Sequence, residues 1–184
     1  MNQSKISVRY AKALFLLAKE KNALDEVYLN LKIVGKVVSE SHELKSVLKN
    51  ATILQSEKKE LLNSVFADFN DIVKDFLNLL VDNDRQDYIL NILRNFSFFY
   101  RKEKNLIHLT ITTVEKISKI LTDNIIKIFS EAYNSQIELE EKLDESIIGG
   151  IIFKIDNNEL NMSVANQLSE IKNSLRSEVY KKKV

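Results

Sequence analysis

The chain has no proline among its 184 residues, and only one glycine, Gly35, precedes residue 149. Proline and glycine interrupt regular structure more than other residues, because proline lacks an amide hydrogen and glycine is unusually flexible. Apolar residues also recur at three- and four-residue spacings through residues 4–104. Together these features predict one helix after another in the first part of the chain.

Six helices are expected there. Ser41 with Glu43 and Ser56 with Glu57 predict the starts of the third and fourth, because a hydroxyl oxygen can accept from unpaired first-turn amides. Short polar links between the helices favour an antiparallel bundle. The apolar positions that define the other four helices are Tyr10, Ala13, Leu14, Leu17 and Ala18; Val27, Leu31, Val34 and Val38; Ile72, Phe76, Leu79 and Leu80; and Ile89, Ile92, Leu93, Phe96 and Tyr100.

The hydrophobic period changes after Lys104. The stretches LIHLTITT (106–113) and QIELEEKL (136–143) alternate between apolar and polar residues, which predicts half-buried strands. The continuously apolar IIGGIIFKI (147–155) is typical of a central strand that is covered on both faces. The turn-forming residues that follow predict a hairpin into ELNM; they are Asp156, Asn157 and Asn158.

Two further helices are expected in this part. Thr112 and Glu115 have the spacing of a capping box, and Ser163 is placed to cap the last helix. The apolar faces of these helices are Ile117, Leu121, Ile125, Ile128 and Ala132, and then Val164, Leu168, Ile171, Leu175 and Val179. We therefore predict a mainly α chain: a six-helix bundle in residues 1–104, then a small α/β domain with a mixed sheet in residues 105–184.

Several kinds of function lack a chemical basis in this sequence. Without cysteine there is no disulfide or thiolate zinc site, and the two histidines, His42 and His108, lie in different halves, so we expect no metal and no catalytic residue. A net charge of +1 offers little attraction for nucleic acid. The basic clusters at 101–104 and 181–183 have no interleaved aromatic residues. No apolar run approaches the ~20 residues of a membrane helix.

The pair Gly149-Gly150 is the most unusual local feature. A phosphate-binding loop would need a lysine and a serine or threonine after its glycines, and Ile-Ile-Phe follows instead. A glycine inside a strand more often marks a bulge or a close approach of another backbone. We therefore interpret the pair as a packing device within a strand.

Three stretches of the chain together resemble one family, the ATP synthase delta subunit, whose mitochondrial counterpart is the oligomycin-sensitivity-conferring protein. They are RYAKALFLLAKEKNALDEV near the start, FLNLLVDNDRQDYILNIL in the middle, and LDESIIGGIIFKI followed by ELNMSVANQLSEIKNSL. The last stretch is similar to the family's C-terminal motif. The motif residues that match are Asp144, Gly149, Gly150, Ser163 and Val164, together with Ser146, Ile148, Leu168 and Leu175.

The first and fifth helices have apolar arcs wider than the ~100° that a surface helix needs. Either both are central helices surrounded on all sides, or they leave an exposed apolar groove that accepts an amphipathic helix. The resemblance implies the groove, with the N-terminal helix of an alpha subunit as its occupant. The lining that we predict is Tyr10, Ala13, Leu14, Leu17, Phe76, Leu77 and Leu80.

The resemblance also implies a task without chemistry or a cofactor. A stator subunit would link the alpha/beta catalytic head, held by residues 1–104, to the b subunits of the peripheral stalk, held by residues 105–184. The start of the chain at its first helix, without a leader, favours a peripheral place on the cytoplasmic face of a bacterial plasma membrane. A nucleic-acid-binding or other protein-interaction adaptor is the alternative.

Overall fold

A computed structural model describes the backbone of residues 3–155 and 158–181, and the side chains of residues 5–155 and 158–173. The chain divides into two compact units, Met1–Glu103 and Lys104–Val184.

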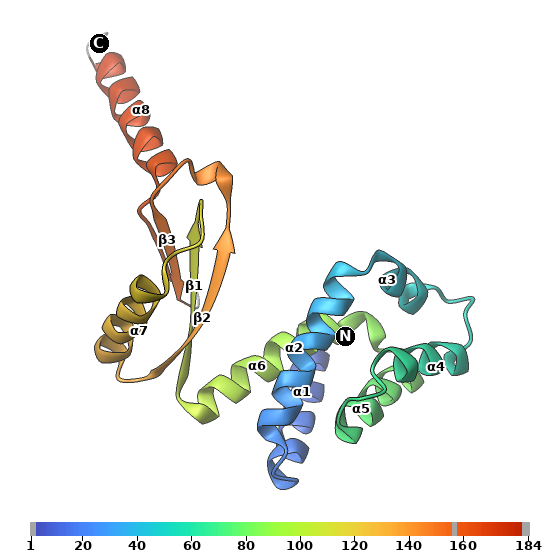
Figure 1. The fold of residues 1–184 in the computed structure, drawn as a ribbon. Helices are drawn as coiled ribbons and strands as arrows, with labels where there is room; N and C mark the ends of the chain where they lie inside the picture. The colour runs from blue at the N-terminus through green and yellow to red at the C-terminus, as the bar shows by residue number, and fades with distance from the viewer. Residues whose placement is uncertain (1–2, 156–157, 182–184) are drawn as a thin grey trace. The chain divides into compact units, whose positions relative to one another are not determined.

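The first unit is helical, as the spacing of its apolar residues predicted (Figure 1). A short 3-10 turn, η1 (Gln86–Tyr88), precedes the last helix of the unit. The six α-helices among the described residues of this unit are α1 (Gln3–Glu20), α2 (Leu24–Glu40), α3 (His42–Lys49), α4 (Gln55–Val65), α5 (Asp71–Asp82) and α6 (Ile89–Lys104).

The core of this unit forms where the apolar stripes of the helices meet. Phe96 of α6 is fully buried, and Phe15 packs edge-on against it with 6.2 Å between ring centroids. Tyr28 of α2 stacks on Tyr100 of α6 at 3.8 Å, and the Tyr100 hydroxyl donates to Asp25 Oδ1 over 2.9 Å. Aromatic pairs in such geometries stabilise the fold beyond the burial of their area.

The two predicted helix starts differ in outcome. Ser41 caps α3, because its hydroxyl accepts from the amide of Leu44 over 3.1 Å. The prediction for Ser56 is wrong: α4 begins one residue earlier, at Gln55, after Leu54, which has no capping side chain. The amide of Lys58 already bonds to the carbonyl of Leu54, so Ser56 lies inside the first turn.

The second unit contains a four-stranded mixed sheet with the order β2-β1-β3-β4, which confirms the expected sheet class. β1 (Leu106–Thr113) pairs in parallel with β2 (Gln136–Leu143) and antiparallel with β3 (Ile151–Ile155). β3 then pairs antiparallel with β4 (Asn158–Asn161). The predicted turn at Asp156 and Asn157 lies outside the described residues.

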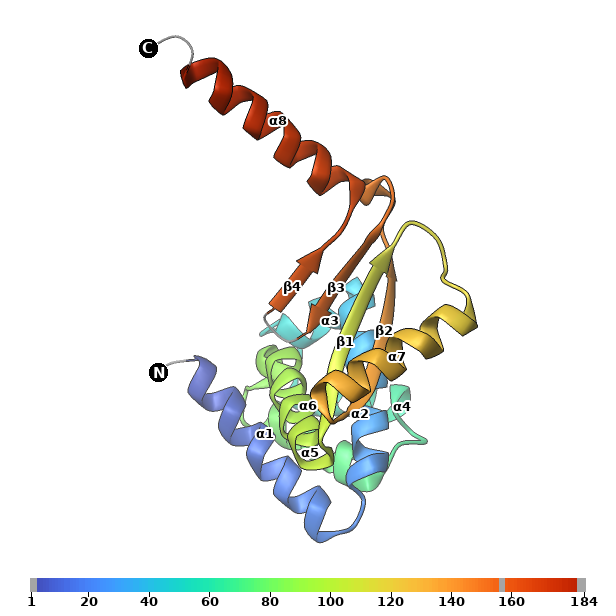
Figure 2. The same ribbon diagram turned by 90° about the vertical axis from the view of Figure 1, so that its left-hand side faces the viewer.

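Helix α7 (Lys119–Tyr133) connects β1 to β2 and lies across one face of the sheet (Figure 2). Leu109, Ile111 and Ile155 point from that face to Ile125 of α7 and form a buried cluster. On the opposite face of β1, His108 Nε2 lies 3.0 Å from a carboxylate oxygen of Glu140. That face is polar because alternate residues of a strand point to opposite sides.

Two sequence predictions for this unit are wrong. The apolar run at 147–155 is not a strand covered on both faces: only Ile151–Ile155 is extended, and Lys154 is exposed. Thr112 does not cap a helix, because its backbone stays in β1, paired with Ile152. Ser118 caps α7 instead, accepting from the amide of Leu121 over 3.4 Å.

Candidate interaction sites

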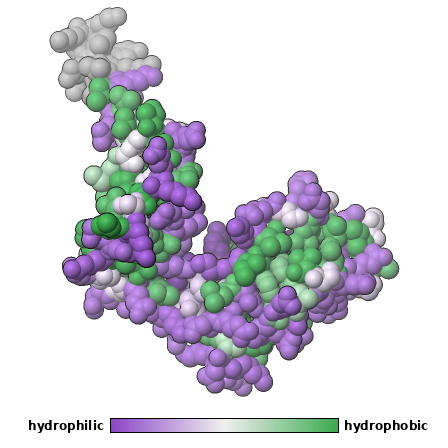
Figure 3. Space-filling model, viewed as in Figure 1, coloured by the Kyte–Doolittle hydropathy of each residue, from purple (hydrophilic) through white to green (hydrophobic). Residues whose placement is uncertain are grey.

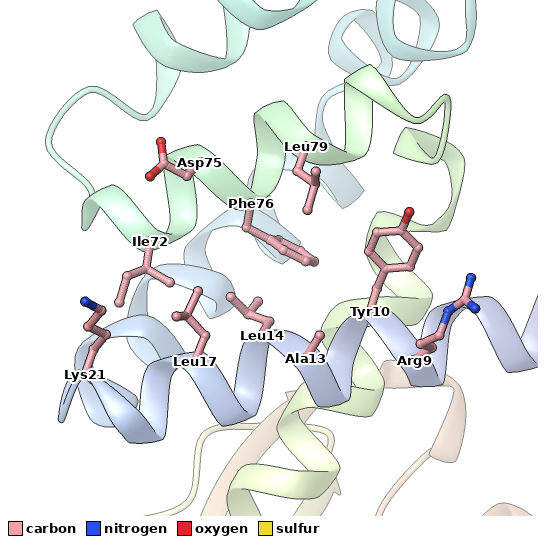
Figure 4. A pocket seen from close by; sticks show the side chains of 10 residues that line it. All are labelled: Arg9, Tyr10, Ala13, Leu14, Leu17, Lys21, Ile72, Asp75, Phe76 and Leu79. Carbon is pink, nitrogen blue, oxygen red and sulfur yellow. The ribbon is translucent and has the colours of Figure 1, made fainter.

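An open apolar groove runs between α1 and α5 of the helical unit (Figure 4). Its volume is about 650 Å³. The residues that line it are Arg9, Tyr10, Ala13, Leu14, Leu17 and Lys21 of α1 and its C-terminal end, and Ile72, Asp75, Phe76 and Leu79 of α5.

Helical periodicity explains how α1 serves both the core and the groove. Ala11 and Ala18 are completely buried on the core side, whereas Ala13 and Leu17 are exposed on the groove side. Residues four apart lie on one side of a helix, so Ala13 and Leu17 form a second apolar row that faces the groove. The wide apolar arc of α1 therefore reflects two contact surfaces, one of which has no partner within the described residues.

Aromatic and aliphatic side chains from both helices form the groove. Tyr10 meets Phe76 edge-on, with ring centroids 6.5 Å apart and an interplanar angle of 63°. Leu17 and Leu79 stand on opposite walls and are 42% and 47% exposed, respectively. Ala13 lies between Tyr10 and Leu17 in Figure 4, and its short side chain leaves room for another helix to approach.

Two of the predicted lining residues are not in the groove. Leu77 and Leu80 are 1% and 0% exposed and belong to the core of the bundle. Ile72 and Leu79 occupy the groove side of α5 in their place. Leu80 follows Phe76 by four residues, a rotation of about 40° beyond a full turn, and this rotation directs it into the core. The seven-residue step from Ile72 to Leu79 keeps those two side chains on one face.

The groove also has charged residues that its apolar pattern did not predict. Arg9 and Lys21 lie at opposite ends of the α1 wall, and Asp75 lies on the α5 wall. The spacing of Arg9, Ala13, Leu17 and Lys21 at intervals of four is the signal that could have placed both cations on the groove side.

The predicted motif residues of the second unit come together at one end of the sheet. Asp144 Oδ1 accepts from the amide of Ser146 over 2.9 Å and caps the short 3-10 turn η2 (Glu145–Ile147). The carbonyl of Gly149 accepts from the amide of Val164 over 3.0 Å, at the start of α8 (Val164–Lys181). This junction connects the end of β2 with the beginning of α8.

Only one glycine of the pair permits a close packing contact, and the pair lies before β3 and not within it as predicted. Gly150 has a φ of +81°, and a Cβ there would lie 2.4 Å from the carbonyl oxygen of Met162. A Cβ on Gly149 would meet only Val164 Cγ2 at 3.4 Å, an ordinary contact. Gly150 is therefore the position where the close approach of another backbone requires glycine.

Ser163 confirms the predicted cap of α8, since its hydroxyl accepts from the amide of Asn166 over 3.2 Å. Its own hydroxyl donates to Asn161 Oδ1 over 2.6 Å. This use of Asn161 was not predicted from the sequence.

The hydrogen bonds from the Ser146 side chain and backbone amide lower the pKa of the Asp144 carboxyl below its ordinary value.

Helix α8 presents an apolar stripe beyond the sheet. Val164, Leu168 and Ile171 are 37%, 53% and 55% exposed, and the helix extends away from the sheet in Figure 2. The side chains of Leu175 and Val179, which continue the predicted stripe, lie outside the described residues.

A second, smaller apolar surface lies on the helical unit. Hydrophobic residues gather over α2, α3 and α4 in Figure 3, and a groove of about 270 Å³ lies there. Its lining residues are Val37, Ser41, Glu43, Leu44, Val47, Leu61 and Val65.

The described residues contain no group of three or more histidine, aspartate or glutamate side chains arranged to hold a metal ion. Within the same residues, no helix combines the length and the hydropathy that crossing a membrane requires.

These features define the class: a mainly α protein of two units, with an open apolar groove on a helical bundle and, in the second unit, a glycine-dependent junction between a small mixed sheet and a projecting helix. Residues 6–175 match the family described as ATP synthase delta (OSCP) subunit. The chain belongs to that family and is therefore a delta-type subunit of an F-type ATP synthase.

The sequences of individual relatives match this chain over nearly their whole length and support the assignment. The chain is 33% identical to ATP synthase subunit delta of Carboxydothermus hydrogenoformans, over 95% of this chain and 99% of the relative. It is 32% identical to ATP synthase subunit delta of Desulforamulus reducens, over 96% and 98%. The fold is similar to a chain of the mitochondrial ATP synthase hexamer of Toxoplasma gondii solved by cryo-EM, with a TM-score of 0.72, 25% identity, and coverage of 92% of this chain and 96% of that one.

Proposed function

We propose that this chain is the stator subunit that joins the catalytic head of an F-type ATP synthase to its peripheral stalk. Membership of the delta (OSCP) family supports this role. A rotary machine produces work only if its head does not turn with the rotor, so such a subunit has to hold two partners firmly at once. We also propose that it is non-catalytic and needs no cofactor, since holding partners requires no chemistry.

The observation that carries the proposal is the groove between α1 and α5. An amphipathic helix binds such a groove by inserting its apolar side chains, usually spaced by three and four residues. Leu17 and Leu79 expose apolar surface on both walls, and Ala13 leaves space between them. We assign the groove, on residues 1–104, to the N-terminal helix of an alpha subunit, with Tyr10, Ala13, Leu14, Leu17 and Phe76 among its contacts.

The second unit supplies the other attachment. We assign residues 105–184 to the b subunits of the peripheral stalk. The exposed stripe of Val164, Leu168 and Ile171 supports this assignment, because a row of apolar residues on a projecting helix favours packing against another helix. Both contacts would hold the chain peripherally at the membrane. We place it on the cytoplasmic face of a bacterial plasma membrane, in keeping with its bacterial relatives.

The groove assignment is tested by titrating the full-length chain with an N-terminal peptide of the alpha subunit from the same organism. Ala13→Asp puts a carboxylate on the apolar wall, and we expect the dissociation constant to rise at least tenfold, about 1.4 kcal/mol. Leu16→Asp is the matched control, because Leu16 is 53% exposed on α1 but does not line the groove. Unchanged affinity in Ala13→Asp, or no binding of the wild-type chain at micromolar peptide, contradicts the assignment.

A further inference from the structure

We infer that the charged ends of the α1–α5 groove select the charge pattern of the helix that enters it. The occupant should carry two acidic side chains about three turns apart along the edge facing α1, and a basic side chain on the edge facing α5. This inference rests on the proposed function, because it describes the same groove and the same kind of partner.

The α1 wall determines the first part of the pattern. Arg9 and Lys21 both line the groove, twelve positions apart in the sequence and on either side of the apolar Ala13 and Leu17 (Figure 4). At a rise of 1.5 Å per residue they are separated by about 18 Å along the helix axis. In a partner helix lying along α1, residues about eleven positions apart lie on the same side of the helix. They are separated by about 17 Å along its axis. Two acids at that spacing would reach both cations at once.

The α5 wall determines the second part. Asp75 is exposed and is the only carboxylate among the residues that line the groove. It lies on the wall opposite to Arg9 and Lys21, so a partner helix between the walls would meet negative charge along one edge and positive charge along the other. A helix with acidic residues on the wrong edge would place like charges together.

The three charges are available to a partner. Among the described residues none of Arg9, Lys21 and Asp75 has an ion-pair or side-chain hydrogen-bond partner. Neighbours on the same helices are paired within the chain. Lys19 Nζ lies 2.6 Å from Glu103, and Lys74 lies 2.7 Å from Asp71. Asp82, at the end of α5, pairs with Lys59.

The expected role of these charges is selectivity more than affinity. Exposed ion pairs contribute little to binding, whereas like charges across an interface suppress incorrect partners and incorrect registers. The apolar row of Ala13 and Leu17 cannot by itself set the register of the partner helix along α1. If the partner shifts by one turn, each lost apolar contact is replaced by another. The cations at its two ends distinguish the registers.

The experiment titrates the full-length chain with the alpha N-terminal peptide at about 20 mM and about 300 mM salt. The variants are Arg9→Glu, Lys21→Glu and Asp75→Lys. Lys12→Glu is the matched control, because Lys12 is an exposed cation on α1 that does not line the groove. We expect each of the three variants to raise the dissociation constant about three- to fivefold at low salt, and Lys12→Glu by less than twofold. High salt should reduce these differences.

A second arm of the experiment uses a peptide with reversed charges. Its acidic residues nearest the two ends of the apolar stripe are replaced by lysine. We expect this peptide to bind the double variant Arg9→Glu/Lys21→Glu more tightly than it binds the wild-type chain. If the wild-type peptide binds but the three variants match Lys12→Glu, the charge pattern is refuted while the groove assignment stands. If the peptide does not bind the wild-type chain, both proposals fail.

Discussion

Gly150 lies against the carbonyl oxygen of Met162 so closely that a Cβ on this glycine would be 2.4 Å from it. The contact joins the segment before β3 to the segment before α8 and holds the junction that Asp144 and Ser163 cap. Backbone approaches of this kind leave no room for a side chain, and the positive φ of Gly150 disfavours other residues independently.

Replacing Gly150 with alanine should therefore destabilise the chain strongly. The left-handed backbone alone costs about 1–2 kcal/mol, and the clash with Met162 forces a backbone shift in addition. Denaturant unfolding of the second unit within the full-length chain, monitored by far-UV circular dichroism and by amide exchange, measures the loss of stability. Gly149→Ala is the control, since its Cβ would make an ordinary 3.4 Å contact, and it should change the stability by under about 1 kcal/mol. Equal stability of the two variants would show that the close contact is unimportant.

Leu79 and Leu80 are neighbours in the sequence with opposite roles. Leu79→Asp should leave the free energy of unfolding nearly unchanged, because Leu79 is 47% exposed, but it should weaken binding of the alpha peptide about tenfold or more. Leu80→Ala should lower the free energy of unfolding by about 2–5 kcal/mol, because it opens a cavity in the core. Thermal unfolding and peptide titration of both variants separate the two effects. A stable Leu80→Ala chain with weak binding would contradict the arrangement.

The junction at Asp144 should make stability depend on pH in the acidic range. The hydrogen bonds from Ser146 lower the pKa of Asp144 in the folded chain. Its contribution is therefore complete above the unfolded pKa of about 3.9, and it is lost as the pH falls through the lower folded pKa. Asp144→Asn should reduce the decline of stability below about pH 4.

Unfolding curves of the wild type and of Asp144→Asn between about pH 2 and 6 test this prediction. Asp123→Asn, which neutralises an exposed aspartate on α7, controls for net charge. If Asp144→Asn retains the full acid slope of the wild type, the hydrogen-bonded carboxylate does not cause it.

Helix α8 should be required for binding the stalk but not the head. Leu168→Asp interrupts the exposed apolar stripe, and we expect it to weaken the binding of soluble b-subunit domains at least tenfold. Asn173→Asp adds the same charge on the other side of α8 and should have little effect. Neither variant should change the affinity for the alpha peptide. Loss of both interactions in Leu168→Asp would indicate a folding defect instead.

The helical order could be predicted because it depends on local spacing. The apolar steps of three and four residues around Leu14, Val34 and Phe96 specify both the existence of the helices and the faces they bury. Helix starts depend on more than local spacing. Ser41 and Ser163 were correctly predicted as caps, whereas Thr112 was not, because its pairing in β1 outweighs a local capping pattern.

The sequence by itself determined which residues are apolar and how often they recur, and therefore the helices and the mixed sheet. Only the tertiary structure decided which apolar residues are covered. Leu79 and Leu80 have the same side chain on the same helix, yet one faces the groove and the other the core. The physical reason is that burial depends on what packs against each face of a helix, and residues distant in the sequence provide that packing.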